Sequence, residues 1–176
     1  PLINAGNGAG EHPTQALLDL YTISKERGGI DGLTITLMGD LKHGRTVHSL
    51  VKLLRMYDVK LNFVSPQELS MPSSYLMSDD SEYLDLDPII EDTDILYVTR
   101  VQRERLADTM VIDFSYAVTQ EDMDRAKDNM VLMHPLPRVG EIPAELDSDP
   151  RAAYFRQMKY GLHVRMALLV SMIGRD

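Results

Sequence analysis

The sequence has no cysteine, no long apolar run and no block of basic residues. The absence of cysteine excludes a disulfide framework, a thiolate zinc site and a cysteine nucleophile. It also favours a reducing compartment, so we expect a cytoplasmic protein. Since no apolar run approaches the roughly 18 residues of a membrane span, we expect a soluble protein that does not enter a membrane.

The charge balance argues against a polyanionic partner. The net charge is −9 and no basic block interrupts it, so we expect no binding to nucleic acid or to an anionic membrane surface. Arginine outnumbers lysine by 12 to 6. Because guanidinium groups pair bidentately with carboxylate and phosphate, a small anionic ligand stays compatible with this composition.

The 176 residues suit one domain with a single core. The chain begins at Pro1 without a methionine, and we expect it to be a piece of a longer protein. Apolar spacing predicts helices over 13–27, 45–58 and 152–173, with Gly161 as a candidate break in the last. A capping box of Thr119 and Asp122 predicts one more helix over 119–130. In the first helix, the spacing favours a buried face of Leu17, Leu20, Tyr21 and Ile23.

Short apolar runs predict strands between these helices, over 33–38, 59–64, 94–99 and 131–133. The acidic stretch 78–88 shows no period. Strands that alternate with helices of ten or more residues imply βαβ units and a parallel sheet. We therefore expect a Rossmann-like α/β fold with helices on both faces, in which ligands bind at the carboxyl ends of the strands.

The segment GEHPTQ stands at the start of the first predicted helix. His12 precedes that start and Gln15 falls in the first turn, where free N–H groups and the helix dipole favour electron-rich ligand atoms. An imidazole there can polarise a carbonyl oxygen, and an amide offers both a donor and an acceptor. The simpler interpretation is a histidine that caps or packs and a surface glutamine.

The segment GDLKHGRT follows a predicted strand and resembles a phosphate loop, except that Arg45 replaces the lysine. No acidic residue ends a later strand to hold magnesium, which argues against a nucleotide site. Arg45 suits a carboxylate or a single phosphate group better. The alternative is an arginine paired to a structural carboxylate such as Asp40.

The segment TRVQRER places several cationic and amide groups after a buried strand. If it stays extended, Arg100 and Gln102 point the same way and Arg103 the other, so that the first two can hold one carboxylate. A solvated run of charge is the alternative. The last segment, HPLPR, is a rigid turn that either aims carbonyl groups at a ligand amine or simply reverses the chain.

What these four segments lack is also informative. The sequence contains no His-Glu-x-x-His, no nucleophile elbow with a Ser-His-Asp order and no paired catalytic carboxylates. A site built from donors orients anions and stabilises developing negative charge, and it forms no covalent intermediate.

Together with DPRAAYFRQ and GLHVRMALL, these motifs resemble the C-terminal, aspartate-binding domain of aspartate carbamoyltransferases, from Leu2 to about Gly174. The form in eukaryotic multifunctional pyrimidine-synthesis proteins is the most similar. The resemblance implies transfer of a carbamoyl group from carbamoyl phosphate to the amine of L-aspartate, giving N-carbamoyl-L-aspartate and phosphate. It implies no metal and no organic cofactor, and a homotrimer as the assembly.

The resemblance also implies roles for individual residues. His12 would bond the carbamoyl oxygen and Gln15 the carbamoyl nitrogen. The aspartate carboxylates would be held by Arg45 and Arg100 with help from Gln102, and Arg105 would order the closed state. The carbonyl groups of Pro135 and Leu136 would receive amino groups, with a cis Leu136–Pro137 bond.

The family's N-terminal carbamoyl-phosphate domain is absent from residues 1–176, and the terminal helix, about 162–173, is expected to pack on it. The stretches 77–86 and 106–118 look shortened, and we expect that residues were omitted there. An ornithine-type enzyme is the nearest alternative. Such enzymes typically carry cysteine in the turn that corresponds to HPLP, and this sequence has no cysteine. A non-catalytic module that kept the fold is the other alternative.

Overall fold

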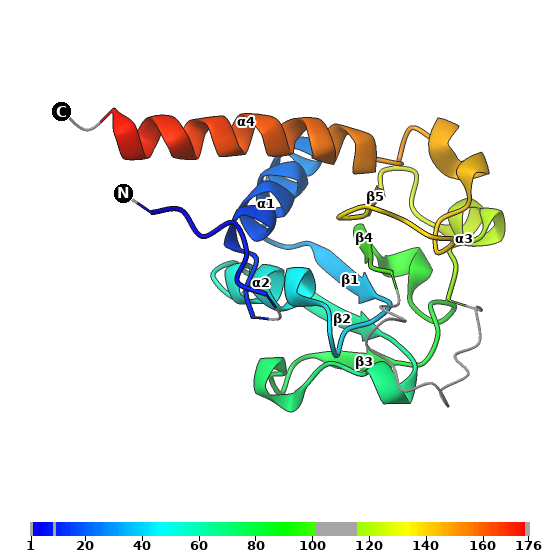
Figure 1. Ribbon diagram of the computed structural model, residues 1–176. Coiled ribbons are helices and arrows are strands. Elements are labelled where there is room, and N and C mark those ends of the chain that lie inside the picture. The colour runs from blue at the N-terminus through cyan, green and yellow to red at the C-terminus, as the bar shows by residue number, and fades with distance from the viewer. Residues whose placement is uncertain (1, 9, 101–115, 175–176) are drawn as a thin grey trace.

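The computed structural model of the chain describes residues 2–8, 10–100 and 116–174 (Figure 1). Within these ranges five strands form one sheet in the order β3, β2, β1, β4, β5, and all neighbours are parallel. The strands are β1 (Thr34–Met38), β2 (Lys60–Val64), β3 (Ser81–Tyr83), β4 (Ile95–Val98) and β5 (Val131–Met133). The α-helices are α1 (Pro13–Arg27), α2 (Arg45–Leu54), α3 (Gln120–Arg125) and α4 (Tyr154–Ile173).

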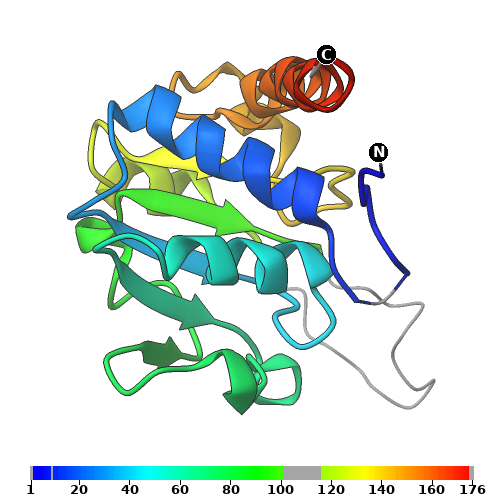
Figure 2. The same cartoon turned by 90° about the vertical axis from the view of Figure 1, so that its left-hand side faces the viewer.

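Helical segments cover both faces of the sheet. Figure 2 shows α1 and α2 side by side over one face. Along β1, Ile35 and Leu37 pack on that side with Val47 and Leu50 of α2, whereas Met38 packs on the other side in the cluster that contains Met123 of α3. Strands that are apolar on both faces need this double cover, and the predicted Rossmann-like α/β fold is confirmed.

Two predicted elements need correction. Strand β3 lies inside the acidic stretch that showed no period, because a strand of three residues at the sheet edge is too short to show an alternation. Helix α3 begins with the predicted capping box of Thr119 and Asp122, but it ends at Arg125 and not near Met130. Ala126 is already extended, since the chain must turn there to enter β5.

Helix α4 runs through Gly161 without a break, so the candidate break was wrong. A Cβ atom at Gly161 would lie 3.0 Å from Leu18 Cδ2, so the glycine allows α4 to approach α1 closely. Helix α1 contacts α2 as well as α4, and its buried face is only partly the predicted one: Ile23 is buried and Leu20 packs against the core. Leu17 and Tyr21 are exposed, whereas the polar residues Asp19 and Thr22 are fully buried.

Gly39 joins β1 to the GDLKHGRT turn at a point where only glycine fits. Its φ is +121°, and a Cβ atom there would lie 2.2 Å from the backbone oxygen of Thr99. The turn after β1 therefore lies directly against the segment that leaves β4. Strand order reverses between β1 and β4, which is the place where a doubly wound sheet forms its ligand crevice.

Candidate active site

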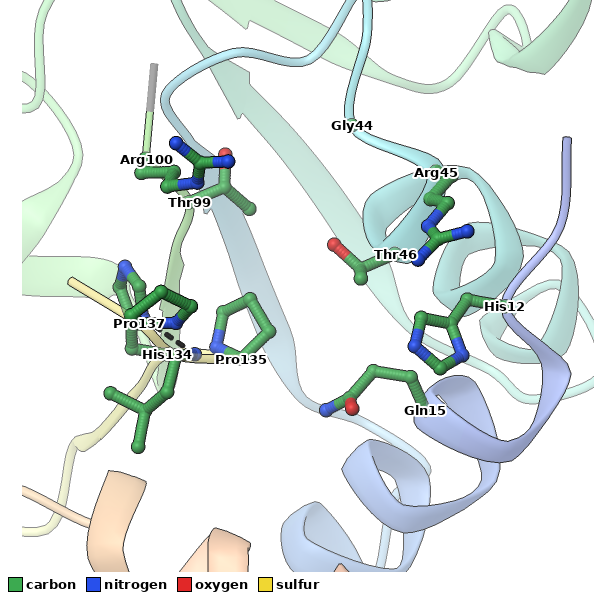
Figure 3. Close-up of a pocket in the computed structure, with 11 residues that line it drawn as sticks. His12, Gln15, Gly44, Arg45, Thr46, Thr99, Arg100, His134, Pro135 and Pro137 are labelled. Carbon is green, nitrogen blue, oxygen red and sulfur yellow. Dashed lines mark hydrogen bonds between the residues drawn. The ribbon is translucent and has the colours of Figure 1, made fainter. Parts of the chain in front are cut away.

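A cavity of about 300 Å³ lies at the carboxyl ends of β1, β4 and β5 (Figure 3). Six of the predicted site residues line it: His12, Gln15, Arg45, Arg100, Pro135 and Leu136. Thr46, Thr99 and His134 also line it and were not predicted. The remaining two predicted residues, Gln102 and Arg105, lie outside the described residues. In the view of Figure 3, Arg100 and the 134–137 turn lie on one side, and His12, Gln15 and Arg45 on the other.

His12 presents its ring at the start of α1. Its side chain does not cap the helix, while its backbone N–H donates to Ser49 Oγ at 2.9 Å and so anchors the loop on α2. The ring atom Nδ1 is buried and has no hydrogen-bond partner among the described residues. Burial, followed by the positive charges of Arg45 and Arg165, lowers the pKa of His12 below its ordinary value of 6.5. The ring is therefore neutral at pH 7, and the nitrogen that it turns toward the cavity is Nε2 (Figure 3).

Arg45 is the first residue of α2 and is half-buried. Its Nη1 donates to the backbone oxygen of Gly8 at 2.6 Å, so the guanidinium group holds the N-terminal segment beside the cavity. Asp40, the structural partner that the sequence offered, instead accepts from the backbone N–H of His43 at 2.9 Å. The structure therefore gives Arg45 a place at the cavity, as predicted, and a backbone acceptor in place of Asp40.

The turn after β5 is shaped by His134, whose role the sequence did not reveal. Its ring is buried, and Nδ1 accepts the backbone N–H of Leu136 at 2.8 Å. The other ring nitrogen must then carry the proton, which it donates to Glu141 Oε1 at 2.8 Å. The Leu136–Pro137 bond is cis, as expected, and Leu136 itself has a positive φ of 54°. His134 thus fixes a turn whose backbone faces the cavity.

Asp19 is fully buried and contacts the cavity residue Gln15. It accepts three hydrogen bonds, from Gln15 Nε2 at 2.9 Å, Gln157 Nε2 at 2.6 Å and the Tyr97 hydroxyl at 2.8 Å. Burial raises the pKa of Asp19 to about 7, although these three donors act in the opposite direction. The sequence analysis missed this cluster because its members come from α1, β4 and α4.

The raised pKa of Asp19 predicts an unusual pH dependence of stability. The unfolded carboxyl group titrates near 3.9, so between about pH 7 and pH 4 the folded state binds a proton that the unfolded state does not. We expect the unfolding free energy to rise relative to Asp19→Asn as the pH falls from 8 to 5, by at most about 1.4 kcal/mol per pH unit. Urea titrations of both proteins at each pH measure this, and parallel curves would contradict it.

Within the described residues, no group of three or more metal-ligating side chains is arranged to hold an ion. Over the same part of the chain, no helix combines the length and the apolar character that crossing a bilayer requires.

Fold and site together define a class. The chain is a doubly wound parallel α/β domain whose crevice brings together an imidazole, an amide and guanidinium groups, a set suited to an anionic ligand with a carbonyl group. Residues 31–172 match the family described as Aspartate/ornithine carbamoyltransferase, Asp/Orn binding domain. Because the match covers most of the chain, the chain belongs to this family, and the resemblance seen in the sequence is confirmed.

Individual relatives are consistent with this assignment. The chain is 54% identical to the Multifunctional protein pyr1-3 of Dictyostelium discoideum over 99% of its own length and 8% of that protein. The M. jannaschii aspartate transcarbamoylase catalytic subunit superposes with a TM-score of 0.90 at 44% identity, covering 100% of this chain and 61% of that one. The Trypanosoma cruzi aspartate transcarbamoylase in complex with aspartate and phosphate gives 0.86 at 46% identity, covering 96% and 56%. The chain therefore spans less than two thirds of each of these relatives.

Proposed function

We propose that this chain is the aspartate-binding domain of an aspartate carbamoyltransferase. The observation that carries the proposal is the convergence of His12, Gln15, Arg45 and Arg100 with the 134–137 turn on one cavity. The relatives named above support the choice of reaction. The transferred group would come from carbamoyl phosphate and the acceptor would be L-aspartate, in pyrimidine synthesis.

The chemistry of the cavity agrees with this reaction. When the aspartate amine attacks the carbamoyl carbon, negative charge develops on the carbonyl oxygen until the bond to phosphate breaks. A neutral donor such as the His12 ring stabilises that charge, and two guanidinium groups hold the carboxylates so that the amine is placed for attack. The carbonyl groups of Pro135 and Leu136 would receive the amino groups. No step needs a metal or an organic cofactor.

Specificity for aspartate over ornithine follows from the charge of the cavity. Arg45 and Arg100 line it, and guanidinium groups attract a second carboxylate and repel a second ammonium group. The relatives named above are all called aspartate enzymes or multifunctional proteins, whereas the family as described includes both substrates.

The proposal includes an N-terminal domain as partner. The buried residues of α4 are Tyr154, Gln157 and Gly161, all in its first half. Beyond them the helix continues past the body of the domain, and its exposed apolar side chains include Leu162, Leu169 and Ile173 (Figure 1). We propose that this second half, about 162–173, packs on the carbamoyl-phosphate domain. The homotrimer implied by the resemblance and the cytoplasmic location expected from the absence of cysteine belong to the same proposal. Sedimentation of the complete protein tests the homotrimer.

The test uses the complete protein that carries this chain. With carbamoyl phosphate and L-aspartate, we expect N-carbamoyl-L-aspartate and phosphate to form in equal amounts, and no product with L-ornithine. The 176 residues alone should bind aspartate weakly and turn over nothing. A complete protein that forms neither product would refute the proposal and favour a non-catalytic module. If the complete protein formed product from L-ornithine, the substrate would be L-ornithine in place of L-aspartate.

A further inference from the structure

The hydrogen bonds around Asp19 fix the direction of two side-chain amides. Gln157 is fixed from both ends, because its Oε1 accepts the backbone N–H of His134 at 3.0 Å and its Nε2 must then face Asp19. Asp19 Oδ1 receives this Nε2 and also the Nε2 of Gln15. When Asp19 is ionised, above its pKa of about 7, its oxygens only accept, so Gln15 must turn its nitrogen toward Asp19.

The other end of the Gln15 amide is therefore left for the cavity. Gln15 lines the cavity, and its Oε1 has no hydrogen-bond partner among the residues that the structure describes. An oxygen in that position accepts from an N–H₂ group and gains nothing from a methyl group of the same size. If the amide were reversed, it would present N–H₂ instead and would disfavour a ligand N–H₂.

We propose that Asp19 determines which end of the Gln15 amide faces the cavity, and that the site thereby selects a ligand with N–H₂ beside its carbonyl group over one with a methyl group. Asp19 acts through Gln15 and is a positioning residue. The inference deepens the proposed function and rests on it, because it explains how Gln15 is oriented toward the carbamoyl nitrogen that the resemblance gives it as a partner.

Two substitutions separate this role from a general structural one. In Asp19→Asn the amide oxygen can replace Oδ1 as acceptor for both glutamines, while its nitrogen donates to the Tyr97 hydroxyl, which can also accept. Asp19→Leu has a similar size and provides no acceptor. Both substitutions remove the charge, so a difference between them reports the hydrogen-bonding groups at position 19.

The ligands are phosphonoacetamide and 2-oxopropylphosphonate, which are stable and differ only in N–H₂ against CH₃. Titration calorimetry on the complete protein gives the ratio of their dissociation constants, and inorganic phosphate serves as the control ligand. We expect the wild type to prefer the amide by about tenfold or more, Asp19→Asn to keep this preference within about threefold, and Asp19→Leu to reduce it to about threefold or less. The affinity for phosphate should change little in either variant.

An unchanged ratio in Asp19→Leu, or an equal fall in both variants, would overturn the inference. If a substitution prevents folding, neutron diffraction from crystals of the deuterated wild type decides the question, because it distinguishes ND₂ from oxygen; an oxygen of Gln15 directed at Asp19 overturns the inference. A protein that forms carbamoyl-aspartate but shows the wrong ratio or orientation refutes only this inference. A protein that binds neither compound and forms no product refutes the proposed function as well.

Discussion

Replacing Arg100 by alanine in the complete protein is expected to reduce kcat/KM for aspartate by roughly 30- to 1,000-fold. This corresponds to about 2–4 kcal/mol, the cost of removing one partner from a desolvated, hydrogen-bonded charge pair. Arg100 leaves the end of β4 at the cavity, where a carboxylate of aspartate would meet it. Initial rates at varied aspartate measure the effect, and most of it should appear in KM if the contact forms before the transition state.

Arg125→Ala is the matched control for this substitution. It removes the same charge, but Arg125 lies on α3 and pairs with Asp87 at 2.8 Å, and it does not line the cavity. We expect its kcat/KM to stay within about twofold of the wild type, since surface ion pairs of this kind contribute little. Arg100→Lys should fall between alanine and wild type because an ammonium group lacks the planar fork of donors. Equal losses in Arg100→Ala and Arg125→Ala would argue against a carboxylate contact.

Replacing His12 by alanine is expected to lower kcat by about 10²- to 10³-fold, or 2.7–4 kcal/mol, as the loss of one donor to a developing oxyanion does in other enzymes. The fold should survive, because the side chain does not cap α1 and the backbone bond to Ser49 remains. Single-turnover kinetics with saturating substrates measure the chemical step.

His12→Asn distinguishes the two ring nitrogens. The amide nitrogen of asparagine can occupy the position of Nδ1, the ring atom that is buried without a partner among the described residues. Because Nδ1 is buried, Nε2 is the nitrogen that can meet a ligand, so we expect His12→Gln, whose amide extends toward the position of Nε2, to recover part of the rate and His12→Asn to recover less. A kcat for His12→Ala within threefold of the wild type would exclude a catalytic donor at this position.

Much of the fold follows from short stretches of sequence. The strands are continuous apolar runs, and the turns that follow them contain their own glycine, proline and capping residues. Arg45, Arg100 and the 134–137 turn share a cavity because parallel strands place all their carboxyl ends at one edge of the sheet, and His12 and Gln15 join them from the start of α1. Residues at consecutive strand ends therefore meet in space even though they are far apart in the chain.

Two predictions from the sequence were wrong for the same reason. Leu17 and Tyr21 were expected to be buried and Gly161 to break a helix, because helical spacing and glycine propensity are local signals. The close contact of α1 with α4 explains why both expectations were wrong. It buries a polar face of α1, and it requires a residue without a side chain opposite Leu18.

The sequence by itself therefore determined the α/β class, the family resemblance and the chemical groups that gather at the strand ends. The tertiary structure alone decided how these groups are held. Asp19 meets Tyr97 and Gln157 across separations of 78 and 138 residues, and no local pattern reports such contacts. Burying a carboxylate is costly unless donors surround it, and only the packing of α1, β4 and α4 brings those donors together.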